Sequence, residues 1–93
     1  MYVVRIIVGG GISDFKVFDR LPHAKERFDA GWLQTEDGEF DSIAIFDVLN
    51  ARDPADAVDA VKCGDKERIQ LREFHESSDI RLKRLLPKLR IEL

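Results

Sequence analysis

The residue types that most often act as nucleophiles and bases are scarce in this sequence, which has one cysteine, Cys63, and two histidines, His23 and His75. A thiolate and an imidazole from distant parts of a chain can meet in the fold and form a nucleophilic pair. Cys63, however, falls at the predicted end of a helix, where the dipole disfavours a thiolate. We therefore expect no catalytic residue and a buried or half-buried thiol, although an enzyme site assembled from scattered residues is left open.

Two stretches carry possible metal ligands. In residues 75–79, HESSD, a helix would place His75 and Asp79 on one face, and residues 36–41, EDGEFD, hold four carboxylates. Two ligands do not close a tetrahedral site, and the acidic stretch lacks the spacing of a calcium loop. The glycines of GGGISD, residues 9–14, match neither phosphate-binding motif and predict a turn. We expect no metal and no cofactor.

The C-terminal segment is basic, with five cations threaded between leucines: Arg81, Lys83, Arg84, Lys88 and Arg90. With Glu92 they give +4 from residue 80 onward, and because the whole chain carries −3, the first 79 residues carry −7. Contact with nucleic acid is one interpretation, but an acidic body repels a polyanion and no aromatic lies among these cations. The favoured interpretation is a solvated face directed toward the acidic run of the same or a second copy, which is Glu36, Asp37, Glu39 and Asp41.

The length and composition of the chain indicate one soluble domain. A chain of 93 residues is too short for two independent cores, and 44% hydrophobic with 35% charged residues fits neither a disordered tail nor a membrane span. The N-terminal apolar run contains Arg5 and does not resemble a signal peptide. We expect a cytoplasmic protein and no membrane role.

Apolar runs predict the first elements. Residues 2–8 and 43–49 are apolar on both faces, as in interior strands, and residues 15–18 predict a shorter strand joined to the first by a glycine-rich hairpin. A helix is expected between the strand at residues 15–18 and the strand at residues 43–49. It would be capped by Asp19 and would carry the apolar stripe Leu21, Ala24, Phe28 and Trp32.

The second half predicts a helix and an edge strand. Asp53 as N-cap, Pro54 in the first turn and Gly64 as the stop delimit a short amphipathic helix. Residues 68–74 alternate polar and apolar side chains, as a half-exposed edge strand does.

The last residues combine helical leucine spacing with Pro87, which disfavours a continuous helix. We expect a helix from about Ser78 to Leu85, capped by Ser77 or Ser78, and then a strand through residues 89–93. That strand could pair with its own sheet or with another subunit, or the end could be frayed.

Together these elements predict one α+β domain over residues 1–93, with residues 78–93 as a basic helix and strand extension. The expected architecture is a two-layer sandwich with a mostly antiparallel or mixed sheet of four to five strands and two covering helices, for which a ferredoxin-like layout is one option. The functional hypothesis is a small non-catalytic interaction or assembly module that forms a homodimer, and the alternative is nucleic-acid binding by the basic segment. The expected interface residues are Phe40, Phe74, Leu89, Ile91 and Leu93.

Overall fold

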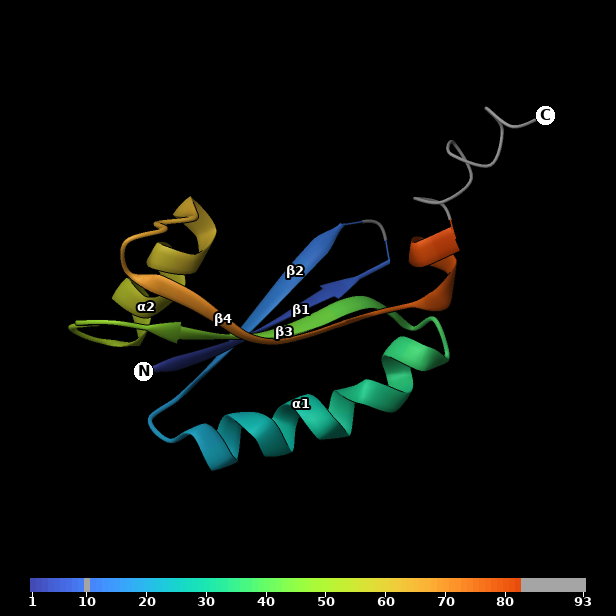
Figure 1. The fold of residues 1–93 in the computed structure, drawn as a ribbon, viewed down its shortest axis with the longest axis horizontal. Helices are drawn as coiled ribbons and strands as arrows, with labels where there is room; N and C mark the ends of the chain where they lie inside the picture. Colours follow the sequence, from blue (N-terminus) through green and yellow to red (C-terminus); the bar gives the residue numbers. More distant parts are fainter. Residues whose placement is uncertain (10, 83–93) are drawn as a thin grey trace.

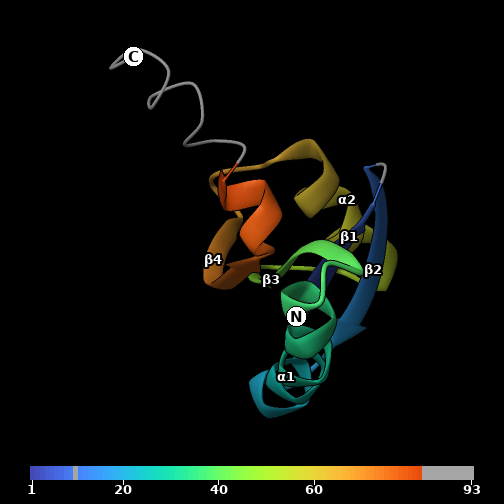
Figure 2. The same ribbon diagram turned by 90° about the vertical axis from the view of Figure 1, so that its right-hand side faces the viewer.

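The described part of the chain forms a four-stranded antiparallel sheet with helices packed against it. The computed structural model describes residues 1–9 and 11–82. Its strands and helices are β1 (Tyr2–Val8), β2 (Ile12–Phe18), α1 (Leu21–Glu36), β3 (Phe40–Val48), α2 (Pro54–Cys63) and β4 (Ile69–Glu76) (Figure 1). The strand order is β2-β1-β3-β4, so β2 and β4 are the edges of the described sheet (Figure 2). The predicted α+β class with a mainly antiparallel sheet is confirmed.

α1 and α2 lie on opposite faces of the sheet. In Figure 1, α1 runs below the sheet along its length, and α2 lies above one end. The face toward α1 buries Val4, Ile6, Ile43 and Ile45 of the strands with Ala24 and Phe28 of the helix. The opposite face buries Val3, Ala44, Phe46 and Val48 with Ala57, Ala60 and Val61 of α2. Because α2 has only 10 residues, about 15 Å of helix, it covers only part of its face.

Both predicted interior strands are confirmed, and the hairpin strand is longer than expected. β2 begins at Ile12, whereas the apolar signal begins at Phe15. Residues 12–14 are exposed, so they carry no apolar alternation, yet they pair with β1. The turn uses Gly11 at φ 84°, whose N–H donates to the carbonyl of Val8 at 3.1 Å.

α1 departs from its prediction at its start and in its buried stripe. Its N-cap is Arg20, which makes no side-chain capping bond, so the prediction of Asp19 as the cap was wrong. The buried residues are Ala24, Phe28, Gly31 and Thr35, whereas Trp32 is 42% exposed. Gly31 explains why the buried stripe passes through residue 31 and not through Trp32. A Cβ at position 31 would lie 2.6 Å from Cδ1 of Ile43, and because glycine has no Cβ, this side of α1 can approach the sheet.

α2 begins and ends where the sequence predicts. Oδ1 of Asp53 accepts the N–H of Asp56 at 2.8 Å, Pro54 is the first helical residue, and Gly64 closes the helix in the left-handed region at φ 65°. The guanidinium of Arg68, just before β4, donates to both carboxylate oxygens of Asp56 at 2.7 and 3.3 Å. This fork ties the first turn of α2 to the start of β4.

The element order rules out the ferredoxin-like layout. Two strands precede the first helix here, whereas the ferredoxin-like order is strand, helix, strand, strand, helix, strand. After β4, residues 78–82 are helical, and Oγ of Ser77 accepts the N–H of Ile80 at 3.3 Å, as expected for the cap. The predicted strand over residues 89–93 lies outside the described residues. No described helix combines the length and the apolar character needed to cross a bilayer.

Candidate interaction surface

β4 carries one residue more than the matching stretch of β3, and this extra residue decides which side chains share a face. Glu73 lies opposite Ile45 and Leu71 lies opposite Phe46, which leaves Arg72 as the bulged residue. Leu71 and Phe74 therefore lie on one side of the sheet, the side that also carries Phe46 and α2. Regular alternation over residues 68–74 would place Phe74 on the same face as Gln70 and Arg72, but the bulge reverses the alternation after Arg72.

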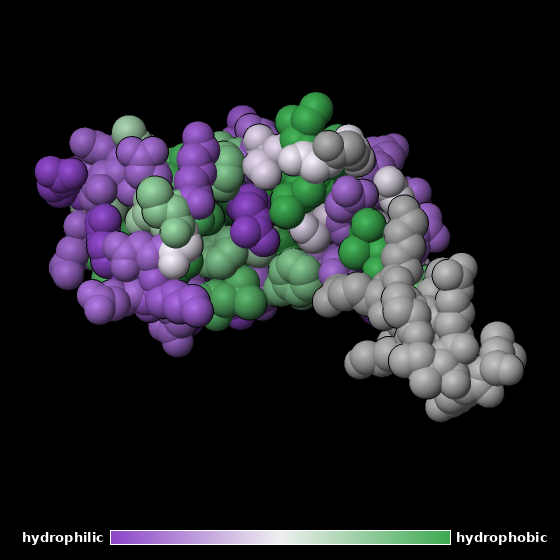
Figure 3. Space-filling view, turned by 90° about the horizontal axis from the view of Figure 1, so that it is seen from above, coloured by the Kyte–Doolittle hydropathy of each residue, from purple (hydrophilic) through white to green (hydrophobic). Residues whose placement is uncertain are grey.

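Apolar side chains are exposed along β4 and the helical residues that follow it. Leu71 is 52% exposed, Phe74 is 46% exposed and Leu82 is 56% exposed. We call Leu71 and Phe74, which share one side of the edge strand, the β4 surface. Figure 3 looks down on the face that α2 partly covers and shows hydrophobic side chains exposed among hydrophilic ones over the middle of the molecule. On a small protein, neighbouring exposed apolar side chains of this size are typical of an interface.

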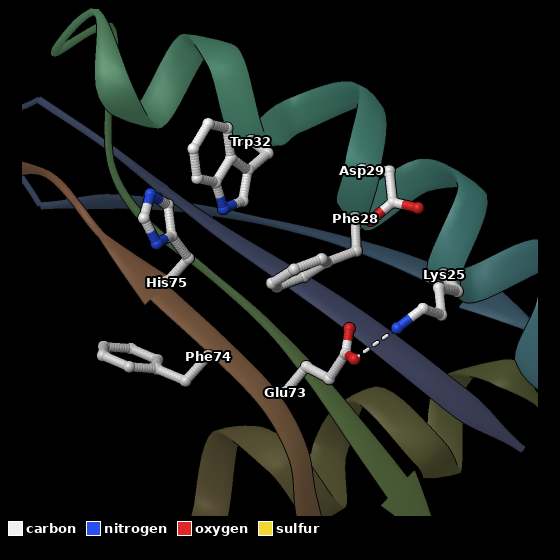
Figure 4. Close-up of a pocket in the computed structure, with 7 residues that line it drawn as sticks. All are labelled: Lys25, Phe28, Asp29, Trp32, Glu73, Phe74 and His75. Atoms are coloured by element: carbon white, nitrogen blue, oxygen red, sulfur yellow. Dashed lines mark hydrogen bonds and ion pairs between the residues drawn. The ribbon is translucent and has the colours of Figure 1, made fainter.

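On its other side, β4 meets α1 around a shallow cavity of about 350 Å³. Figure 4 shows the indole of Trp32 against the imidazole of His75, and Lys25 reaching Glu73. The two rings are stacked, with centroids 4.7 Å apart and an interplanar angle of 18°. The lining residues are Lys25, Phe28, Asp29, Trp32, Glu73 and His75, together with Phe74, whose ring points away from Trp32 and Phe28 in Figure 4.

Two ionisable side chains of this cavity, Lys25 and His75, contact carboxylates of the same chain. The hydrogen bond from Nζ of Lys25 to Oε1 of Glu73, together with their attraction, raises the pKa of Lys25. A lysine held protonated is a poor nucleophile. Nε2 of His75 lies 2.7 Å from Oε1 of Glu36, close enough for an ion pair with a protonated imidazole, although the angle is not that of a hydrogen bond.

The acidic run lies beside the start of the basic segment. Nη2 of Arg81 is 3.8 Å from Oε1 of Glu36, and the N–H of Ser77 donates to the carbonyl of Asp41 at 2.9 Å. Arg81 is the one member of the predicted cationic set among the described residues, and it contacts a carboxylate and the hydroxyl of Ser78 in the same chain. Lys83, Arg84, Lys88 and Arg90 lie outside the described residues, so the structure leaves their role a prediction.

The predicted interface residues are not all in one place. Phe74 belongs to the β4 surface, but Phe40 is half-buried against the core between α1 and the sheet. Its ring lies 3.6 Å from the position a Cβ would take at Gly31. Leu89, Ile91 and Leu93 lie outside the described residues.

The structure does not gather the candidate catalytic residues. His23 is exposed in the first turns of α1, and Cys63 ends α2 on the opposite face of the sheet. Cys63 is exposed, so the expectation of a buried or half-buried thiol was wrong.

The proposed metal pair does not form either. His75 lies in β4 and Asp79 in the helical residues beyond Ser77, so they do not share one helical face. Within residues 1–9 and 11–82, no three His, Cys, Asp or Glu side chains converge as a metal site.

No protein-family model matches this chain, and no curated protein or solved structure matches it at a significant level.

Two features of this region were not predicted from the sequence. The stack of Trp32 on His75 needs the register of β4 against α1, and Trp32 at helical spacing from Phe28 predicted only burial. The bulge at Arg72 is a property of strand pairing and depends on β3. The one sequence signal that could have indicated it is the apolar pair Leu71 and Phe74 at a spacing of three residues, which regular alternation would place on opposite faces.

Proposed function

We propose that this chain is a small non-catalytic interaction module that self-associates through the β4 surface, with a second copy of the chain as the partner. The observation that carries the proposal is the exposure of Leu71 and Phe74 on the same side of an edge strand. Burying a large apolar side chain is worth about 1.5–3 kcal/mol, and an isologous contact buries each one twice.

Charge supports a second copy as the partner. The acidic run and the start of the basic segment both border the end of β4, as the contact between Arg81 and Glu36 shows. Because both signs lie at the same end of β4, each of them can find a partner of opposite sign when that end of a second copy comes close. Two copies can therefore place the cations of one beside the carboxylates of the other.

The bulge favours packing of side chains over continuous strand pairing. An extra residue interrupts the regular pattern of main-chain donors and acceptors along an edge, which is one way natural sheets limit edge-to-edge pairing. We therefore place Leu71 and Phe74 of the two copies in face-to-face contact near the twofold axis.

Sedimentation equilibrium of the full chain over a wide concentration range tests this proposal. The wild type should behave as a dimer that dissociates on dilution, and Phe74→Ser should weaken the association by about tenfold or more, because one buried large side chain is lost from each copy.

Leu33→Ser is the matched control, because Leu33 is 66% exposed on α1, away from the β4 surface. It should leave the association unchanged. A wild type that stays monomeric at high concentration, or equal effects of the two variants, would contradict the proposal.

A further inference from the structure

Arg5 is a charged side chain in the middle of the sheet without a carboxylate partner among the described residues. It lies on β1 between Phe15 of β2 and Ala44 of β3, on the face that α2 partly covers. Its side chain is half-buried, and its Cζ lies 4.9 Å from the centroid of the Phe46 ring. Nε is buried and has no hydrogen-bond partner, whereas buried polar groups are normally satisfied. Burial also lowers the pKa of this guanidinium.

A second cation shares the cavity beside Arg5. The cavity, of about 400 Å³, is lined by Arg5, Ser13, Phe15, Val61 and Lys62, which come from β1, β2 and α2. Nζ of Lys62 lies 5.4 Å from the centroid of the Phe15 ring. The lining contains two cations, a hydroxyl group and two apolar side chains, but no carboxylate. Its volume lies within the usual range for small-molecule sites, about 300–1,000 Å³.

We propose that this cavity binds a small organic phosphate, with the phosphate held by Arg5 and Lys62 and the organic group lying against Phe15 and Val61. A guanidinium presents a planar fork that matches phosphate oxygens, and an ammonium adds a compact positive charge. The hydroxyl of Ser13 supplies a further donor. A bound phosphate would give the guanidinium the anionic partner that the described part of the chain does not provide. The cavity lies toward the β2 edge, opposite β4, so this inference is independent of self-association.

Titration of the full chain followed by amide NMR tests the inference. The probes are phenyl phosphate, inorganic phosphate and benzoate at constant ionic strength. Phenyl phosphate should give saturable shifts at residues 5, 13–15 and 61–62, and it should bind about tenfold or more tightly than either other probe. Inorganic phosphate lacks the apolar group, and benzoate carries a single charge.

Lys62→Ala should weaken phenyl phosphate binding by about tenfold or more, and Lys66→Ala, which removes an exposed lysine from the turn after α2, should not. Arg5→Ala should abolish binding. If that variant does not fold, as circular dichroism would show, Arg5→Lys keeps a cation on a long stem and should bind more weakly than the wild type. The inference is overturned if no probe saturates at these residues, if benzoate binds as tightly as phenyl phosphate, or if Lys62→Ala and Lys66→Ala have the same effect.

Discussion

Gly31 lies where α1 comes close to the sheet, and it yields a stability prediction at the scale of one residue. A Cβ at this position would lie 2.6 Å from Cδ1 of Ile43, which is fully buried and has little room to move. We expect Gly31→Ala to destabilise the fold by about 1–3 kcal/mol in urea unfolding, despite alanine's higher helix propensity.

Removing the clashing methyl group should reverse the sign of this effect. In an Ile43→Val background, Gly31→Ala should become stabilising by up to about 1 kcal/mol, because the helix propensity of alanine is then gained without the clash. The same destabilisation in both backgrounds would show that close packing is not the reason for a glycine at this position.

Asp56 gives a pH prediction. The hydrogen bond from Arg68, followed by that from the N–H of Arg52, holds the pKa of Asp56 well below its ordinary value of 3.8. A lowered pKa contributes stability that is fully present above the ordinary value and is lost as the pH falls toward the folded-state pKa. Asp56→Asn should therefore unfold more readily than the wild type at pH 7, and the difference should shrink below about pH 4.

The measurement is the urea midpoint of both proteins at several pH values between 3 and 7. Asp59→Asn, an exposed aspartate of the same helix, serves as the control and should show a smaller change. A gap between Asp56→Asn and the wild type that stays constant over this range would contradict the role given to the Arg68 fork.

At the scale of elements, the contribution of the N-cap of α2 to stability can be tested, because the sequence predicts Asp53 as this cap and the structure confirms it. Asp53→Ala removes the acceptor for the N–H of Asp56, and it should cost about 1 kcal/mol in thermal or urea unfolding. Asp59→Ala removes a carboxylate from the same helix without uncapping it and should have little effect. Equal losses in the two variants would mean that the cap contributes no stability.

The elements that the sequence predicted best are those whose local signals agree with their burial. β1 and β3 are apolar on both faces and are interior strands. α2 begins at its N-cap Asp53 and ends at its C-cap Gly64, as the sequence predicts. The first residues of β2 were missed because an exposed edge strand needs no apolar alternation. The start of α1 was misplaced because its N-cap, Arg20, makes no side-chain bond that a sequence pattern could reveal.

The candidate sites were less predictable because they depend on register. The spacing of Leu71 and Phe74 has no meaning in a regular strand, and only the bulge at Arg72 brings them to one face. In the same way, Arg5 interrupts an apolar run in the sequence, and its neighbours Phe15 and Lys62 become visible only when β2 and α2 are in place.

At the scale of the whole molecule, the separation of charge predicts how self-association depends on salt. The first 79 residues carry −7 and the remainder +4. If these charges attract two copies to one another, raising the salt concentration from about 50 to about 500 mM should weaken the dimer several-fold, because exposed charges are screened. A dimer that strengthens with salt would point to apolar contact alone.

The most direct test of self-association through the β4 surface is disulfide cross-linking from the bulge. In a Cys63→Ser chain, Arg72→Cys places a thiol at the bulge of the edge strand and keeps both Leu71 and Phe74, while it removes the contact of Arg72 with Asp47. Arg20→Cys places a thiol at the exposed start of α1. Under mild oxidation we predict rapid formation of a covalent dimer for Arg72→Cys and little for Arg20→Cys. Equal yields from the two positions, or no dimer from Arg72→Cys at concentrations where the wild type sediments as a dimer, would contradict the account.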